Sequence, residues 1–167
     1  FGAVKTDGTL WTCGRNTYGE TGQNTTGDAF NLSSPTQVGT DTTWNRVAGG
    51  NVNHAATKTD GTLWVWGYGG FGVLGLNVGA DTGSYSKSSP TQIPGTNWAY
   101  VKPLSFGYIA TKTDGTLWSW GYNNSGNLGL NTSSPARYSS PTQVPGTWDI
   151  SKLTSSGQTR SIGAFKP

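Results

Sequence analysis

The sequence has no methionine, one cysteine and one histidine among its 167 residues. A single cysteine excludes a disulfide within the chain, and one cysteine with one histidine cannot supply the ligand cluster of a structural zinc site. No apolar run approaches the roughly 18 residues that a membrane-spanning helix needs. The sequence therefore predicts no metal site and no membrane span.

Charge is also scarce, because only 11% of the residues are charged and the formal net charge is +3. The lysines and arginines are scattered without a run, so they do not form the basic patch that nucleic-acid binding requires. Glycine is abundant, with 26 residues, and short β-branched or aromatic segments lie between Asp-Gly, Gly and Pro. This pattern predicts an all-β protein with many tight turns and no nucleic-acid partner.

The chain is a tandem array. The phrase KTDGTLW begins at Lys5, Lys58 and Lys112, at spacings of 53 and 54 residues, and SSPTQ follows in each copy before a further Trp. We delimit one partial domain, 1–167, with repeats at about 1–53, 54–107 and 108–161. Residues 162–167, IGAFKP, resemble the opening FGAVKT and start a fourth repeat. Together with the missing methionine, this predicts a segment of a longer chain.

Each KTDGT phrase indicates a β-hairpin, because Asp and Gly tolerate the backbone angles of a tight turn. The predicted turn residues are Asp7, Gly8, Asp60, Gly61, Asp114 and Gly115.

The strand after each turn is apolar on both faces. In the second copy Trp64 and Trp66 alternate with Leu63 and Val65, so the sheet must be covered on both sides. Repeated four-stranded sheets packed face to face around an axis form a β-propeller; a parallel β-helix has shorter repeats, and a β-sandwich needs no such period. The small residues before each turn are expected on the strand nearest the axis. The expected blade core includes Trp11, Trp64, Trp66, Trp118 and Trp120.

The phrases DGTLWVWGYGGFGVLGLN (residues 60–77) and DGTLWSWGYNNSGNLGLN (residues 114–131), each followed by SSPTQ and a Trp, resemble the regulator of chromosome condensation repeat. The resemblance covers essentially the whole chain. It implies four-stranded antiparallel blades of a propeller that in the family usually has about seven blades. Three blades alone would leave apolar faces bare, so the remainder of the chain or neighbouring subunits are expected to close the propeller.

Catalytic and cofactor chemistry find little support. Residues 67–72 spell G-x-G-x-x-G, but no helix is expected to follow and hold a pyrophosphate, so no cofactor is predicted. His54 occupies a repeat position that holds Phe, Tyr or Ile in the other copies, which indicates packing. A glycan hydrolase or lyase would need two converging carboxylates, and no feature of the sequence brings two together. We expect no enzyme activity.

Two sets of aromatic residues are candidate binding residues. The loop before Ser-Ser-Pro varies in length and content, and in each copy it carries one aromatic residue: Phe30, Tyr85 or Tyr138. Variable loops on a rigid scaffold are frequent binding sites, although these rings could equally pin each loop to its blade. The second set lies in the turn after Trp-Gly or Cys-Gly and comprises Tyr18, Tyr68, Phe71 and Tyr122.

The sequence predicts a non-catalytic structural or recognition module that binds a protein or a glycan through its loop faces. The near-identical repeats, rich in Asn, Ser and Thr, resemble those of bacterial or phage members of the family. This resemblance favours an exposed, extracellular place in a virion appendage or on a cell surface. One alternative is guanine-nucleotide exchange with chromatin binding, which would need an inserted wedge and a basic tail that these residues lack. Another is a secreted enzyme inhibitor.

Overall fold

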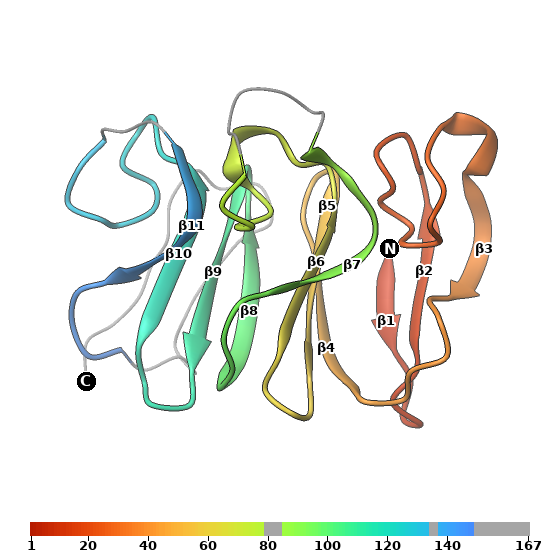
Figure 1. The fold of residues 1–167 in the computed structure, drawn as a ribbon, viewed down its shortest axis with the longest axis horizontal. Coiled ribbons are helices and arrows are strands. Elements are labelled where there is room, and N and C mark those ends of the chain that lie inside the picture. Colours follow the sequence, from red (N-terminus) through yellow and green to blue (C-terminus); the bar gives the residue numbers. More distant parts are fainter. Residues whose placement is uncertain (79–84, 134–136, 149–167) are drawn as a thin grey trace.

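The computed structural model describes residues 1–78, 85–133 and 137–148, which form three antiparallel sheets set side by side (Figure 1). The first sheet has the order β1 (Gly2–Val4), β2 (Leu10–Gly14), β3 (Leu32–Gln37). The second has the order β4 (Trp44–Gly49), β5 (Asn53–Lys58), β6 (Leu63–Gly67), β7 (Lys87–Ile93). The third has the order β8 (Trp98–Leu104), β9 (Gly107–Lys112), β10 (Leu117–Tyr122), β11 (Arg137–Val144). Two short 3-10 turns, η1 (Asp28–Phe30) and η2 (Gly70–Gly72), interrupt the loops.

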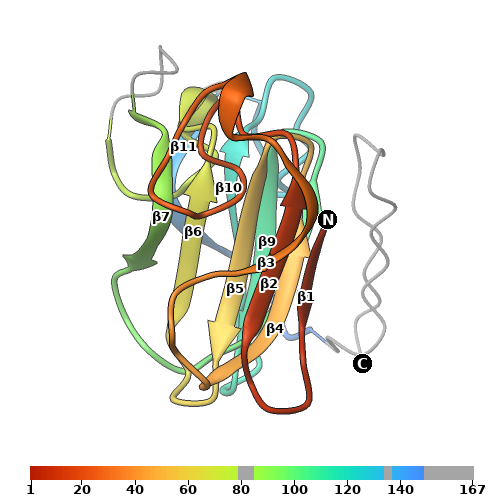
Figure 2. The same cartoon turned by 90° about the vertical axis from the view of Figure 1, so that its right-hand side faces the viewer.

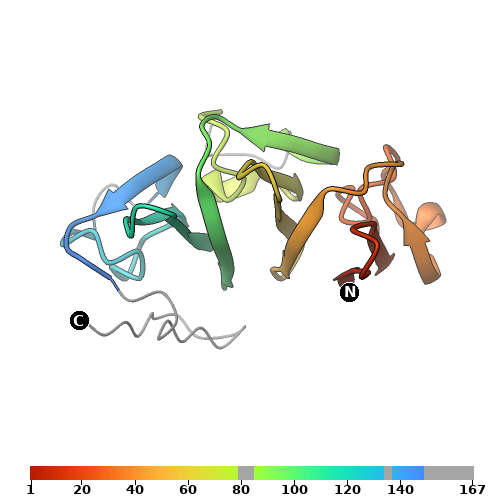
Figure 3. The same cartoon turned by 90° about the horizontal axis from the view of Figure 1, so that it is seen from below.

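The sheets stand face to face, with their strands running along nearly one direction (Figure 2). Their first strands converge on one side of the molecule, where β4 contacts both β1 and β8, while β7 lies on the opposite side (Figure 3). The small residues Ala55 and Ala56 lie on β5, one strand outward from that inner edge. Their expected place on the innermost strand was therefore wrong, because β4 and β8 occupy it.

The second and third sheets each take their first strand from the end of the preceding sequence repeat. The second sheet runs from Trp44 to Ile93 and the third from Trp98 to Val144. The Trp that follows each of the first two SSPTQ phrases therefore opens the next sheet.

The hairpin turns are built alike in all three sheets. In the second sheet the Gly61 N–H donates to the Lys58 carbonyl at 3.1 Å, and the Lys58 N–H donates to the Thr62 carbonyl at 3.0 Å. Gly61 has φ of 78° whereas Asp60 stays at negative φ, so the turn is a type I turn closed by a left-handed glycine.

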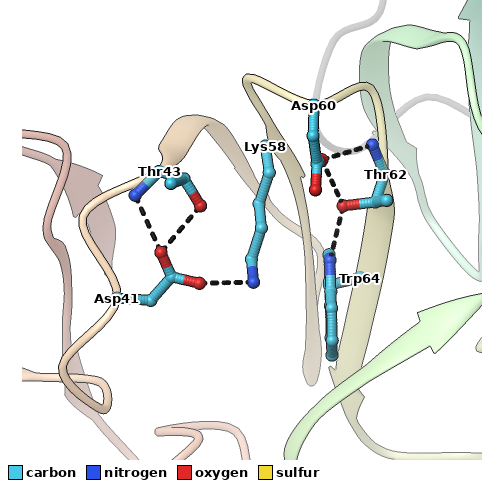
Figure 4. Close-up of polar contacts among 6 residues, drawn as sticks. All are labelled: Asp41, Thr43, Lys58, Asp60, Thr62 and Trp64. Atoms are coloured by element: carbon cyan, nitrogen blue, oxygen red, sulfur yellow. Dashed lines mark hydrogen bonds and ion pairs between the residues drawn. The ribbon is translucent and has the colours of Figure 1, made fainter.

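A short relay of side chains stiffens this turn (Figure 4). The Thr62 N–H and hydroxyl both donate to the Asp60 carboxylate, at 2.9 and 2.7 Å, and the Trp64 indole N–H donates to the Thr62 hydroxyl at 2.8 Å. The other two turns repeat the relay with the triplets Asp7, Thr9, Trp11 and Asp114, Thr116, Trp118. Trp11, Trp64 and Trp118 are accordingly half-buried, at the edge of the core.

The middle sheet is apolar on both faces, as the alternation of residues 62–66 predicts. On one face Trp66 packs with Leu10, Val38 and Trp44 between the first and second sheets. On the other face Leu63 and Val65 join a larger cluster with Trp98 and Trp120 between the second and third sheets. Burial of these two clusters holds the three sheets together.

The second Trp of each LWxWG phrase also bridges neighbouring sheets through a hydrogen bond. The Trp66 indole N–H donates to the Glu20 carbonyl at 2.9 Å, and the Trp120 indole N–H donates to the Val73 carbonyl at 3.0 Å. Both side chains have no exposed surface. Each indole therefore contributes apolar burial and satisfies a carbonyl of the adjacent sheet's loop.

We expect Trp120→Phe to lower the free energy of unfolding by about 2–4 kcal/mol, because the buried Val73 carbonyl loses its donor and the smaller ring leaves a cavity. Urea unfolding followed by circular dichroism measures this change. Trp118→Phe is the matched control, since its indole N–H bonds a hydroxyl in an exposed turn and should cost less than about half as much. Equal costs for the two variants would contradict a special role for the bond between sheets.

Candidate recognition surface

Five aromatic side chains form a connected row across all three sheets, at the end of the strands opposite the Asp-Gly turns. We call this set the aromatic row: Tyr18, Tyr68, Phe71, Phe106 and Tyr122. Four of its members belong to the predicted second set, and Phe106 is new.

The rings of the row contact one another edge to face or at a tilt. Tyr18 and Tyr68 have centroids 4.9 Å apart at 63°, and Tyr68 and Phe71 have centroids 6.2 Å apart at 60°. Phe71 then lies 5.7 Å from Phe106 and 5.0 Å from Tyr122. Such geometry is the favoured one for aromatic pairs, so the row is a packed unit.

The backbone anchors the row in the same way in two sheets. The Tyr68 N–H donates to the Val52 carbonyl at 2.9 Å, and the Tyr122 N–H donates to the Phe106 carbonyl at 2.8 Å. Val52 and Phe106 thus hold equivalent places in the loop between the first two strands of their sheets. These two loops carry no repeated phrase. Only an alignment of the two loops could have identified Phe106 from the sequence.

Phe71 is the centre of the row and is held in an uncommon backbone conformation, with φ of 59° and ψ of 16°. This left-handed region costs a non-glycine residue about 1 kcal/mol or more. The guanidinium of Arg137 lies 5.3 Å from the Phe71 ring centroid, within cation–π range. A strained aromatic residue that contacts three other rings and a cation is typical of a functional position.

The strain at Phe71 coincides with a change in the repeat. In the other two repeats a buried asparagine ties down this loop: the Asn16 and Asn123 carboxamides accept from the N–H of Thr21 and Leu128, each at 3.1 Å. The second repeat has Gly69 at the equivalent place, where a Cβ atom would come within 2.4 Å of the Tyr85 backbone. The middle loop is therefore built differently, and it presents Phe71.

A hollow of about 100 Å³ lies at the third-sheet end of the row. Its walls include Phe106, Tyr122 and Ser125, and Ser125 takes the place that Phe71 holds in the second repeat. The row thus ends beside a small polar recess.

The first predicted aromatic set is not brought together, since no ring contact joins its members in the described part of the chain. Phe30 and Tyr85 are 51% and 40% exposed, whereas Tyr138 lies on β11 and packs against two hydrophobic clusters. Parts of the second and third variable loops, at 79–84 and 134–136, lie outside the described residues.

The ionisable groups are arranged for structure. Hydrogen bonds from Thr9, Thr62 and Thr116 lower the pKa of the turn carboxyls Asp7, Asp60 and Asp114. A glycoside hydrolase needs a carboxylic acid whose pKa is raised, which is the opposite direction.

His54 stacks on Trp66 with ring centroids 5.4 Å apart, and burial lowers its pKa to about 4. The ring is therefore neutral at pH 7 and serves as a packing group. Among the described residues no three His, Cys, Asp or Glu side chains lie together in a way that could hold a metal ion. No helix in the described ranges is long and apolar enough to cross a membrane.

Asp41 and Lys58 form the strongest ion pair of the described residues, at the end of the sheets that carries the Asp-Gly turns (Figure 4). The Asp41 carboxylate accepts from Lys58 Nζ at 2.5 Å and from the Thr43 N–H and hydroxyl at 2.8 and 2.7 Å. The bond from Lys58, followed by that from Thr43, lowers the pKa of Asp41 from 3.8 to about 2. This pair links the loop before β4 to the end of β5.

The model of the regulator of chromosome condensation (RCC1) repeat matches residues 60–102 and 114–158. These two segments make up more than half of the chain, so the chain belongs to the RCC1 repeat family. The all-β fold with antiparallel blades, expected from the sequence, is confirmed.

Two curated relatives show the same similarity. The chain is 28% identical over 130 residues to the ultraviolet-B receptor UVR8 of Arabidopsis thaliana, which covers 76% of this chain and 28% of the receptor. It is 28% identical over 137 residues to the human E3 ubiquitin-protein ligase HERC2, which covers 81% of this chain but 3% of the ligase. The chain thus spans less than a third of the length of either relative.

Solved structures share the fold. Human WBSCR16 matches with a TM-score of 0.70 at 23% identity, over 86% of this chain and 35% of that one. Prp20p from Saccharomyces cerevisiae, described with its binding to Gsp1p and histones, matches with a TM-score of 0.74 at 20% identity, over 91% and 37%. A structure of Kap60 bound to yeast RCC1 (Prp20) matches with a TM-score of 0.75 at 20% identity, over 91% and 36%.

We expect Phe71→Gly to be more stable than Phe71→Ala by about 1 kcal/mol, the reverse of the usual order, because only glycine adopts this φ without strain. Both variants lose the ring, so its packing cancels in the comparison. Urea unfolding of the two proteins measures the difference. An alanine variant as stable as the glycine variant would show that position 71 is not strained.

We expect Asp41→Asn to lower stability at neutral pH, with the difference shrinking as the pH falls from about 4 through about 2. The pKa of Asp41 is depressed in the folded state, so its contribution is fully present above about pH 4 and is lost as the pH falls through about 2. The side chain is 35% exposed, and solvent screening reduces the expected difference at pH 7 to about 1 kcal/mol. The turn carboxyls titrate in both proteins and cancel. A difference between the two proteins that does not change with pH would contradict this assignment.

Proposed function

We propose that the chain is a non-catalytic recognition module that binds a partner protein through the aromatic row. The observation that carries this proposal is the continuity of five rings across three sheets, centred on the strained Phe71. Tyrosine and arginine, which supply three of the five rings and the adjacent cation, are among the residues most enriched at protein–protein hot spots.

The ring geometry favours a protein over a glycan. Neighbouring rings are inclined at 46° to 84°, so they do not form the flat platform on which a sugar ring would stack. An uneven aromatic surface with a small polar recess instead suits the irregular side chains of a protein. The same fold in Prp20 is described with protein partners, which supports this choice by analogy.

The finer expectation, an exposed place in a virion or on a cell surface, is supported by the low charge content and the near-identical repeats. The alternative of guanine-nucleotide exchange has support from the fold shared with Prp20. The two separate by assay, because an exchange factor would accelerate release of GDP from a small nuclear GTPase whereas a structural adhesin would not.

To test the row, the chain is immobilised and its partner is captured from an extract of the source cells and identified by mass spectrometry. The affinity of that partner is then measured for the double variant Phe71→Gly, Phe106→Ser. We expect affinity to fall about 30-fold or more, as for a hot spot worth 2 kcal/mol.

The double variant Phe30→Ser, Tyr85→Ser is the matched control, since it removes two exposed rings outside the row. Its affinity should change less than about twofold. If this control loses binding while the row variant keeps it, the variable loops are the site and the aromatic row is a packing feature. A glycan array probed with the same proteins gives the corresponding answer for sugars.

A further inference from the structure

A groove lined by two tryptophans and a lysine recurs at both junctions between sheets. The first junction groove, of about 410 Å³, contains Trp44, Trp64 and Lys58. The second junction groove, of about 320 Å³, contains their equivalents Trp98, Trp118 and Lys112. Each groove is completed by a proline and a serine from the SSPTQ strand of the following sheet.

The lysine is caged by indole rings in the same way in both grooves. Lys58 Nζ lies 4.7 Å from the Trp44 ring and 4.2 Å from the Trp64 ring. Lys112 Nζ lies 4.8 Å from Trp98 and 4.7 Å from Trp118. The paired indoles stand at 73° to each other at both junctions, with centroids 6.1 and 6.0 Å apart. The two cages are therefore copies of one arrangement.

The two cages differ in one respect, which is the presence of a carboxylate. In the first groove the Asp41 side chain reaches Lys58 Nζ at 2.5 Å, and the lysine side chain is only 12% exposed. Asp41 stands three residues before Trp44, and Gly95 stands three residues before Trp98. No ion pair to Lys112 occurs among the described residues.

The second groove has room for the missing group. A Cβ atom added at Gly95 would meet a single neighbour within 4 Å, the Trp98 indole nitrogen at 3.9 Å. The indole N–H groups of Trp44 and Trp98 both lack an acceptor, so they do not distinguish the grooves. Among the described residues, the distinguishing feature is a half-buried ammonium that has two aromatic faces but no ion-paired carboxylate.

An ammonium group that is removed from water loses the stabilisation of its hydration, and aromatic faces replace only part of it. Pairing with a carboxylate therefore stabilises the ammonium further, in addition to the cation–π contacts. The first groove supplies this group from within the chain. We propose that the second junction groove binds an aspartate or glutamate side chain of a partner protein, whose carboxylate pairs with Lys112 as that of Asp41 pairs with Lys58.

The occupant is assigned as a protein side chain because the first groove already contains one. Asp41 shows that an aspartate fits the cage and reaches the lysine, and the walls of the second groove add the apolar contacts of Ile93, Pro94 and Pro141. The groove lies at the Asp-Gly end of the strands, so this contact is additional to the aromatic row and does not depend on it.

The test uses N-acetyl-aspartate amide as the probe and N-acetyl-asparagine amide as its neutral control, with the indole N–H signals of the chain followed by nuclear magnetic resonance. We expect the Trp98 and Trp118 signals to shift saturably with the acidic probe, with Kd of about 1–10 mM, since a single partly exposed ion pair is weak. The neutral probe should give no saturable shift, and the Trp44 and Trp64 signals should not respond to either probe.

Two variants make the assignment decisive. Lys112→Gln should weaken the response of Trp98 about tenfold or more while the spectrum remains that of the folded chain. Asp41→Ala should create a new response at Trp44 and Trp64, because it empties the first groove and leaves Lys58 without its carboxylate.

The proposal is overturned if the neutral probe shifts the same signals equally, if the response persists in Lys112→Gln, or if the folded chain shows no saturable shift. Tighter binding of glucuronate than of the acidic probe would also overturn it, because the groove would then select a sugar acid rather than a protein side chain.

Discussion

The structure depends on burial of both faces of one sheet by its neighbours. Trp66 makes this requirement concrete, since its ring fills the space between two sheets and its indole N–H satisfies the Glu20 carbonyl across that space. Trp120 does the same between the second and third sheets. A single sheet of this sequence would expose such a ring and its apolar neighbours to water, so the repeats are stable only as a stack.

Because the sheet faces are committed to the stack, the side chains left for other work lie at the ends of the strands. The two ends differ in chemistry. One end carries the Asp-Thr-Trp relays and the caged lysines. The other end carries the aromatic row with Arg137 above Phe71. The two candidate surfaces therefore lie at opposite ends of the stack and differ in the side chains that they present.

Much of the fold could be predicted from the sequence because it follows from local rules that repeat. The Asp-Gly phrases specify the turns, and alternation of Trp with Leu and Val specifies a sheet covered on both sides. The sequence could not show which strand lies innermost. Ala55 and Ala56 are small, and small residues are expected both at a crowded axis and on a strand that is packed on both faces. The packing on both sides of β5 is the reason.

The candidate surface was less predictable than the fold, because it depends on contacts between loops of different repeats. Tyr18, Tyr68, Phe71 and Tyr122 could be named as a set from their shared place in the repeat, but their contact could not. Phe106 lies in a loop with no repeated phrase and joins them only in three dimensions. Tyr138 shows the opposite case. The sequence places it in a variable loop, but in the structure it lies on a paired strand and packs against two hydrophobic clusters.

In a chain of near-identical repeats, the departures from identity are the most informative positions. A repeat that only had to stack could keep asparagine where Gly69 stands, as Asn16 and Asn123 do, and would have no need of a left-handed Phe71. Likewise Asp41 and Gly95 differ where the surrounding Trp–Lys cages are the same. The shared residues account for the stack, and the two departures lie at its two candidate contact surfaces. Stability alone accounts for the shared residues and for Asp41, but it gives no reason for the strained Phe71 or for a Lys112 that lacks the ion pair of Lys58.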